Sequence, residues 1–121
     1  MQPEIYTLPT VSFVGGSTQD LRFRLKDKLG NVIDASNFTG NFAVCDYRYK
    51  DSNYLFNENL QFIQDEGGVC SILRVVINAA NTRDKYGKYV YQITLKDPSG
   101  RYGIPNQGIL NITKNIDQGF R

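Results

Sequence analysis

The side chains in this sequence that are able to do chemistry are few and scattered. There is no histidine among the 121 residues, so the usual general base, the commonest metal ligand and the Ser-His-Asp and Cys-His arrangements are missing. Asp65 and Glu66 are adjacent, but they stand in the glycine-rich stretch "QDEGG", where paired carboxylates are ordinarily solvated. The stretch "DKLGNVIDAS" lacks calcium-loop spacing, and no phosphate-binding glycine loop follows a predicted strand. We therefore expect no catalytic residue, no metal, no cofactor and no enzymatic activity.

The two cysteines, Cys45 and Cys70, leave two interpretations open. They can be reduced thiols that pack as small apolar groups, or they can form a disulfide that closes the intervening loop. A zinc site is not indicated, because it needs four ligands in close pairs. An antibody-type bridge is not indicated either, because neither cysteine lies in the strand that would carry its second half. We favour two reduced thiols.

Aromatic residues near one predicted turn are the candidate interface residues, and they are Tyr47, Tyr49, Tyr54 and Phe56. Exposed aromatics beside loops commonly anchor protein interfaces. An ordinary second core face explains the same four residues equally well. The three tyrosines are also able to stack on a sugar, but carbohydrate sites usually prefer tryptophan, which the sequence lacks.

A row of basic residues, Arg22, Arg24 and Lys26, alternates along the stretch "DLRFRLK". Such a row can follow a phosphate backbone, but the solvated face of an amphipathic strand explains it better. Basic groups on a strand also discourage edge-to-edge pairing. The net charge of +2, from 14 basic and 12 acidic residues, is too balanced to indicate a nucleic-acid or membrane partner. We expect neither.

Hydrophobic alternation and frequent turns predict an all-β domain. In "DLRFRLK" the apolar residues point one way and the basic ones the other. The run "VCSILRVVI" is apolar on both faces, which suggests a central strand. About seven or eight short strands, with turn signals every ~8–12 residues, are typical of an antiparallel β-sandwich. The expected core residues are Leu21, Phe23, Leu25, Leu73, Val75, Tyr91, Ile93, Leu95, Leu110 and Ile112.

The organisation of the chain is expected to be simple. Residues 1–18 form an extended N-terminal segment, in which residues 5–8 and 11–14 can pair briefly at a sheet edge. Residues 19–116 form the sandwich, with one short helix within residues 79–86, and residues 117–121 form a C-terminal tail. Tyr89 is placed either as a tyrosine corner of the immunoglobulin type, its hydroxyl bonded back to the backbone, or as a half-buried aromatic.

The start of the chain, "MQPEIYTLPT", has neither a basic beginning nor an apolar segment. We therefore expect no secretory signal. No stretch approaches the ~20 apolar residues that span a bilayer. We expect the protein to be made, and at first kept, in the cytoplasm.

Two long stretches resemble the N-terminal domain of phage baseplate upper proteins. "DLRFRLKDKLGNVID" is similar to the opening of that domain, an alternating strand followed by a "D-x-x-G-N" turn. "GKYVYQITLKDPSGRYGIPNQGILNITKNI" is similar to its end, with a "G-x-Y-x-Y-Q-I" strand, an Asp/Gly turn and a final "L-x-I-x-x-N-I" strand. The short polar crossing "NAANTRDKY" also has a counterpart. The resemblance spans about residues 17–116.

This resemblance implies an immunoglobulin-like sandwich in a virion that is assembled in the bacterial cytoplasm. In the family the domain anchors a fibre or receptor-binding region to the tail or to another virion component. It implies other virion proteins as partners, within a homo-oligomer or another symmetric assembly. Family members usually continue into long helical or fibre regions, whereas this sequence ends at Arg121. We therefore expect either a capsid decoration or fibre-attachment subunit, or a fibre on a separate chain. The alternative functions are a carbohydrate- or host-surface-binding module and an accessory domain of a bacterial surface protein.

Overall fold

The computed structural model describes residues 8–26, 29–47, 55–103 and 107–117. These residues form nine strands and one short helix, so the prediction of an all-β domain is confirmed. The elements are β1 (Val11–Val14), β2 (Gln19–Arg24), β3 (Thr39–Asp46), β4 (Phe56–Asn59), β5 (Gln61–Ile63), β6 (Ile72–Ile77), α1 (Ala79–Thr82), β7 (Gly87–Lys96), β8 (Tyr102–Gly103) and β9 (Gln107–Thr113).

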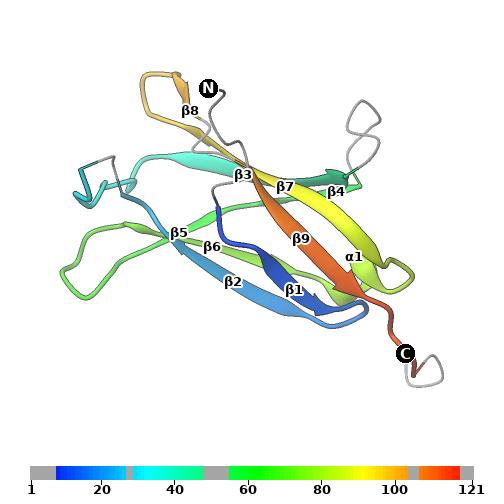
Figure 1. Ribbon diagram of the computed structural model, residues 1–121. Coiled ribbons are helices and arrows are strands. Elements are labelled where there is room, and N and C mark those ends of the chain that lie inside the picture. The colour runs from blue at the N-terminus through cyan, green and yellow to red at the C-terminus, as the bar shows by residue number, and fades with distance from the viewer. Residues whose placement is uncertain (1–7, 27–28, 48–54, 104–106, 118–121) are drawn as a thin grey trace.

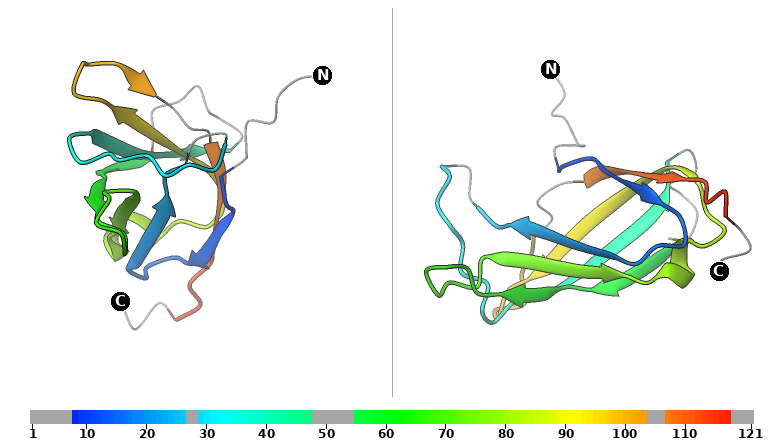
Figure 2. Two further views of the ribbon diagram at one scale, coloured as in Figure 1. Left: turned by 90° about the vertical axis from the view of Figure 1, so that its left-hand side faces the viewer. Right: turned by 90° about the horizontal axis from the view of Figure 1, so that it is seen from below.

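The strands form two sheets that lie face to face (Figure 1, Figure 2). The large sheet has the order β1-β9-β7-β3-β4, with β8 paired to the end of β7, and the small sheet has the order β2-β6-β5. The strand β1 runs parallel to β9, whereas the other named strand pairs are antiparallel. Matched in chain order to the strands of an immunoglobulin domain, β2, β5 and β6 correspond to B, D and E of one sheet. The strands β3, β4, β7 and β9 correspond to C, C′, F and G of the other sheet. The domain is therefore an immunoglobulin-like β-sandwich.

The hydrophobic core lies between the two sheets and matches most of the prediction. The predicted residues that are buried are Leu25, Leu73, Val75, Tyr91, Ile93, Leu95, Leu110 and Ile112. Leu21 and Phe23 are only partly buried against this cluster, because β2 is an edge strand of the small sheet with a single neighbour. The sequence left open which face of β3 points inward. Phe42 and Val44 are both 0% exposed and define the inward face.

Tyr91 is the central residue of the core. Its ring stacks on Phe42 with 5.3 Å between ring centroids, and it contacts Phe23 at 5.7 Å. The ring lies directly over Gly108, its Cα partner on β9, where any side chain would collide with it. Its hydroxyl donates a hydrogen bond to the backbone oxygen of Pro9. The buried phenol thereby satisfies its polar atom and ties the chain before β1 to the sandwich.

The start of β7 contains the tyrosine corner, which is one of the two interpretations that the sequence left open for Tyr89. The Tyr89 hydroxyl donates a hydrogen bond to the backbone oxygen of Tyr86 at 3.2 Å, which is the arrangement typical of immunoglobulin-type sandwiches. Burial raises the pKa of the Tyr89 phenol. The predicted helix within residues 79–86 is α1, and its buried Thr82 accepts a hydrogen bond from the backbone N–H of Gly16. The corner and the helix thus fix one end of the sandwich.

The N-terminal segment is partly integrated into the large sheet. Residues 11–14 were expected to pair at a sheet edge, and β1 does so, with Val11 to Val14 paired to Leu110 to Thr113 of β9. The boundary between the N-terminal segment and the sandwich was expected after residue 18. It therefore lies C-terminal to β1, a strand that already belongs to the sandwich. Residues 1–7, including most of the other predicted edge segment, lie outside the described part of the chain.

Candidate docking face

The outward positions of the large sheet form a surface that we call the neutral face. They are Ser12 and Val14 of β1; Thr39, Asn41, Ala43 and Cys45 of β3; Asn57 and Asn59 of β4; Lys88, Val90, Gln92, Thr94 and Lys96 of β7; Tyr102 of β8; and Gln107, Ile109, Asn111 and Thr113 of β9. Amide and hydroxyl side chains predominate, and the only charged residues in this set are two lysines. The face is therefore able to form many hydrogen bonds while carrying little charge.

Side chains of the neutral face hold one another in place across the strands. The Gln107 side-chain amide donates a hydrogen bond to Oε1 of Gln92 at 2.8 Å, and the Gln92 amide donates to Oγ1 of Thr94 at 3.1 Å. At the β1 edge the Asn111 amide reaches Oγ of Ser12 at 3.5 Å. These contacts restrict side-chain rotation before any partner binds. A pre-ordered surface loses less conformational entropy on association.

Both lysines of the neutral face lie over tyrosine rings. Nζ of Lys88 is 4.3 Å from the ring centroid of Tyr47, and Nζ of Lys96 is 5.6 Å from that of Tyr102. A cation over the face of an aromatic ring is attracted by the ring quadrupole, which contributes about 0.5–1 kcal/mol at an exposed site. The Lys88–Tyr47 pair therefore adds an aromatic ring at one end of the neutral face, and the Lys96–Tyr102 pair adds one at the other end.

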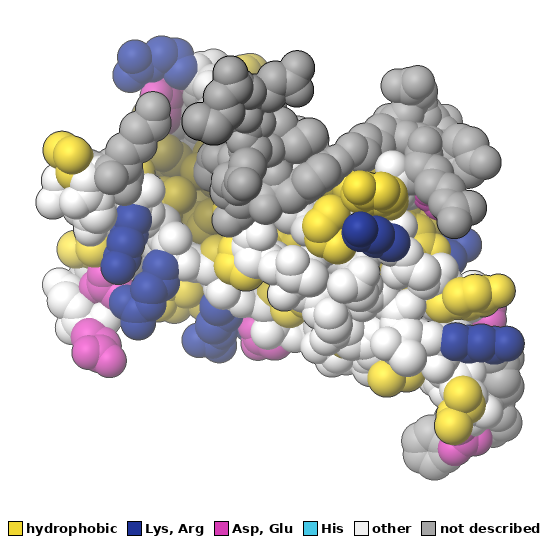
Figure 3. Space-filling model, in the orientation of Figure 1, with side chains coloured by type: hydrophobic (Ala, Val, Ile, Leu, Met, Phe, Trp, Pro, Cys, Tyr) yellow, Lys and Arg dark blue, Asp and Glu magenta, His cyan; other side chains and the backbone are white. Residues whose placement is uncertain are grey.

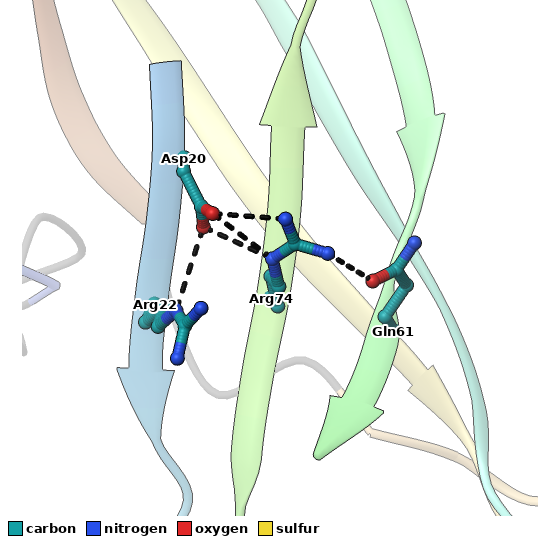
Figure 4. A network of polar contacts seen from close by, with 4 residues as sticks. All are labelled: Asp20, Arg22, Gln61 and Arg74. Atoms are coloured by element: carbon teal, nitrogen blue, oxygen red, sulfur yellow. Dashed lines mark hydrogen bonds and ion pairs between the residues drawn. The ribbon is translucent and has the colours of Figure 1, made fainter.

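The outward face of the small sheet is charged. Arg74 of β6 donates two hydrogen bonds through Nε and one through Nη2 to the Asp20 carboxylate, and its Nη1 donates to Oε1 of Gln61 at 2.7 Å (Figure 4). The bonds from Arg74 hold the pKa of Asp20 below its usual value. Arg22 and Arg24 are exposed on the same face, as expected for the solvated side of β2. In Figure 3 charged side chains gather over β2, whereas the surface over β1 and β9 is mostly neutral.

The four candidate interface aromatics do not gather at one site. Tyr47 is half-buried at the end of β3, beside the neutral face. The assignment of Phe56 to an interface is wrong. Its side chain is 8% exposed and belongs to the core, because it is the Cα partner of Val44 on the inward face of β3. Tyr49 and Tyr54 lie outside the described residues.

The amides of the neutral face were missed as functional candidates. The sequence does carry a signal for these polar residues. Gln92 and Thr94 alternate with core residues along β7, and Gln107 and Asn111 do so along β9. Alternation predicts that such residues face water. It does not show that they are neighbours, which follows only from the pairing of β7 with β9.

Among the described residues, no group of three or more His, Cys, Asp and Glu side chains is placed to hold a metal ion. Both cysteines are free thiols, Cys45 in β3 of the large sheet and Cys70 just before β6 of the small sheet. Burial, and secondarily the charge of Asp46, raises the pKa of the Cys45 thiol. This reduces its thiolate fraction and hence its reactivity.

Comparisons with known proteins find similarity at the level of structure, where 23 chains match. No protein-family model matches the sequence, and no curated protein matches it. The fold is similar to that of murine CRIg, with a TM-score of 0.43 and 13% sequence identity over 88% of this chain and 92% of that chain. Within the described residues, no helix is both long and apolar enough to cross a membrane. The sheet order and the tyrosine corner identify the chain as an immunoglobulin-like β-sandwich.

Proposed function

We propose that this protein is a non-enzymatic structural subunit of a bacteriophage virion, which docks on other virion subunits through the neutral face. The proposed virion role is supported by the resemblance of residues 17–116 to the N-terminal domain of phage baseplate upper proteins. The observation that carries the docking assignment is the difference between the two outward faces. One face is charged and linked by ion pairs, and the other is almost uncharged and rich in amides.

The central part of a protein interface is depleted in charged residues and enriched in aromatic ones. The middle of the neutral face shares the depletion in charge, because Cys45, Val90 and Ile109 form one uncharged row across three strands, in which Val90 itself is only 2% exposed. The next row contains Gln92 and Gln107, which are bonded to each other. We call these two rows the docking rows. A partner with a neutral, hydrogen-bonding surface would meet this region without burying an unpaired charge, which costs several kcal/mol per ion.

The first experiment concerns the particle. Intact particles are purified from the producing bacterium and analysed by quantitative mass spectrometry. The protein should be present at a fixed ratio to the major capsid protein. Its absence from particles, together with accumulation as a soluble monomer, would show that it is not a virion subunit.

The second experiment concerns the face. Gln92→Glu and Asn111→Asp each place a carboxylate on the neutral face with almost no change in shape. Each should reduce incorporation into particles by about tenfold or more, because the charge must be desolvated on docking. Gln64→Glu is the matched control, since Gln64 is exposed in the loop after β5, away from the neutral face. Equal incorporation of the three variants, at unchanged melting temperature, would exclude this face as the docking surface.

A further inference from the structure

At the β4–β8 end of the neutral face lies an open groove with a volume of about 290 Å³. It is lined by Thr39, Gly40, Asn41, Asn59, Thr94, Leu95, Lys96 and Tyr102. We propose that this groove binds an oligosaccharide that carries a carboxylate. The proposal concerns different residues from the docking rows and does not depend on the virion assignment.

The strand register places three hydrogen-bonding side chains in one row. Asn59 of β4 is the Cα partner of Asn41 of β3, and Asn41 is the partner of Thr94 of β7. Adjacent strands are separated by about 4.8 Å, so the row extends over roughly 10 Å. This length matches that of a disaccharide. The spacing between neighbours is close to that between the hydroxyl groups on opposite sides of one sugar ring.

The polar groups in this row are available to a ligand. Within the described part of the chain, the side-chain amides of Asn41 and Asn59 form no hydrogen bond. Each amide supplies two donors and one acceptor, which suits sugar hydroxyls because they also both donate and accept. The Thr94 hydroxyl accepts a bond from Gln92, so its own proton remains free to be donated. The row therefore provides complementary bonds for a polyhydroxylated ligand.

A tyrosine with a neighbouring ammonium group closes the groove on the β8 side. Tyr102 is 72% exposed and also borders a second hollow, lined in part by Asp97 and Arg101. Its ring offers a flat apolar surface on which the C–H face of a sugar can pack. Nζ of Lys96 lies 5.6 Å from the ring centroid. Since none of the described residues that line the groove is acidic, the ammonium group favours a sugar with a carboxylate.

The proposal is tested on a microarray of neutral and carboxylated microbial oligosaccharides, with affinities then measured by calorimetry on the best glycan. We expect binding to carboxylated glycans. Tyr102→Ala and the double variant Asn41→Ala, Asn59→Ala should each weaken binding at least about tenfold. Lys96→Gln should lower the preference for the carboxylated glycan over its uncharged counterpart, because it removes the charge but keeps a polar side chain that is only one atom shorter.

A matched control pair lies at the opposite end of β7. Tyr86, just before that strand, is 62% exposed, and Nζ of Lys114 lies 5.7 Å from its ring centroid. Tyr86→Ala should therefore leave glycan binding unchanged. The proposal is overturned if no glycan on the array binds, or if Tyr86→Ala and Tyr102→Ala have the same effect at equal thermal stability. The Asn111→Asp variant should retain glycan binding, because Asn111 is paired with Lys88 near the other end of β7, and this separates failure of this proposal from failure of the docking face.

Discussion

The contact between Gly108 and Tyr91 gives the sharpest test of the core. A Cβ atom added to Gly108 would lie 2.4 Å from Cζ, 2.5 Å from Cε1 and 2.6 Å from Oη of Tyr91. Carbon atoms in favourable contact are about 3.5–4.0 Å apart, so the ring would have to move by about 1 Å. Tyr91 is 0% exposed, stacks on Phe42 and bonds to the backbone of Pro9. It therefore has little room in which to move.

The magnitude of the Gly108→Ala effect follows from two opposing contributions. Overpacking a filled core costs about 1–3 kcal/mol, and the upper part of this range applies because the ring is held on several sides. Replacing glycine by alanine also lowers the entropy of the unfolded chain, which stabilises the protein by about 0.4–1 kcal/mol. We expect the free energy of unfolding to fall by about 2 kcal/mol. Gly103→Ala is the matched control, because nothing lies within 4 Å of the added Cβ in β8.

The assay is equilibrium urea unfolding followed by circular dichroism, performed as a double-mutant cycle with Tyr91→Ala. That substitution alone should cost about 3–5 kcal/mol by leaving a cavity. In its background Gly108→Ala should be neutral or stabilising, because the methyl group then enters empty space. If Gly108→Ala is within about 0.5 kcal/mol of Gly103→Ala, or if the two core substitutions are additive, the steric reasoning is incorrect.

Three further predictions concern packing and titration. Phe42→Ala should cost about 3–5 kcal/mol in urea unfolding, and Phe23→Ala clearly less, because Phe42 is 0% exposed whereas Phe23 is only partly buried. Burial raises the pKa of Tyr91 from 10.0 to about 12, so the stability that the neutral phenol contributes should be complete below pH 10 and lost as the pH rises towards 12; Tyr91→Phe should flatten this part of the unfolding profile. The lowered pKa of Asp20, due mainly to its hydrogen bond with Arg74, predicts a contribution that is present above about pH 4 and lost as the pH falls through the folded-state value; Asp20→Asn should show a weaker acid dependence.

Much of the fold was predictable because strand alternation reports burial directly. The positions of Leu73 and Val75 in β6, and of Ile93 and Leu95 in β7, follow from period two, and all four are buried. The tyrosine corner also has a local signal, since the Tyr89 hydroxyl reaches back only to Tyr86. The inward face of β3 did not follow, because both of its faces carry apolar residues and only contact with the opposite sheet distinguishes them.

The candidate sites were much less predictable, because they depend on which strands are neighbours. Asn41 and Asn59 are separated by 18 positions in the sequence, yet they are directly opposed in the register of β3 and β4. Gln92 and Gln107 meet only because β9 returns beside β7. The aromatic signal was misleading for Phe56, since a core aromatic at the start of a strand has the same sequence context as an exposed one beside a loop.

The two proposed surfaces can operate at the same time, because the register places them on different rows of one sheet. One docking row crosses β3, β7 and β9 at Cys45, Val90 and Ile109, and the other contains Gln92 of β7 and Gln107 of β9. The groove instead crosses β4, β3 and β7 at Asn59, Asn41 and Thr94. A partner seated on the docking rows would leave the projecting β7–β8 hairpin uncovered (Figure 1). Tyr102 lies in this hairpin, at the far end of β7. Each copy in an assembly would then present its own groove, and binding to a glycan surface would strengthen with copy number. Assembled particles should therefore bind the glycan more tightly than the isolated subunit, and Tyr102→Ala should remove this gain without changing incorporation. A loss of incorporation in Tyr102→Ala would show that the two surfaces are one.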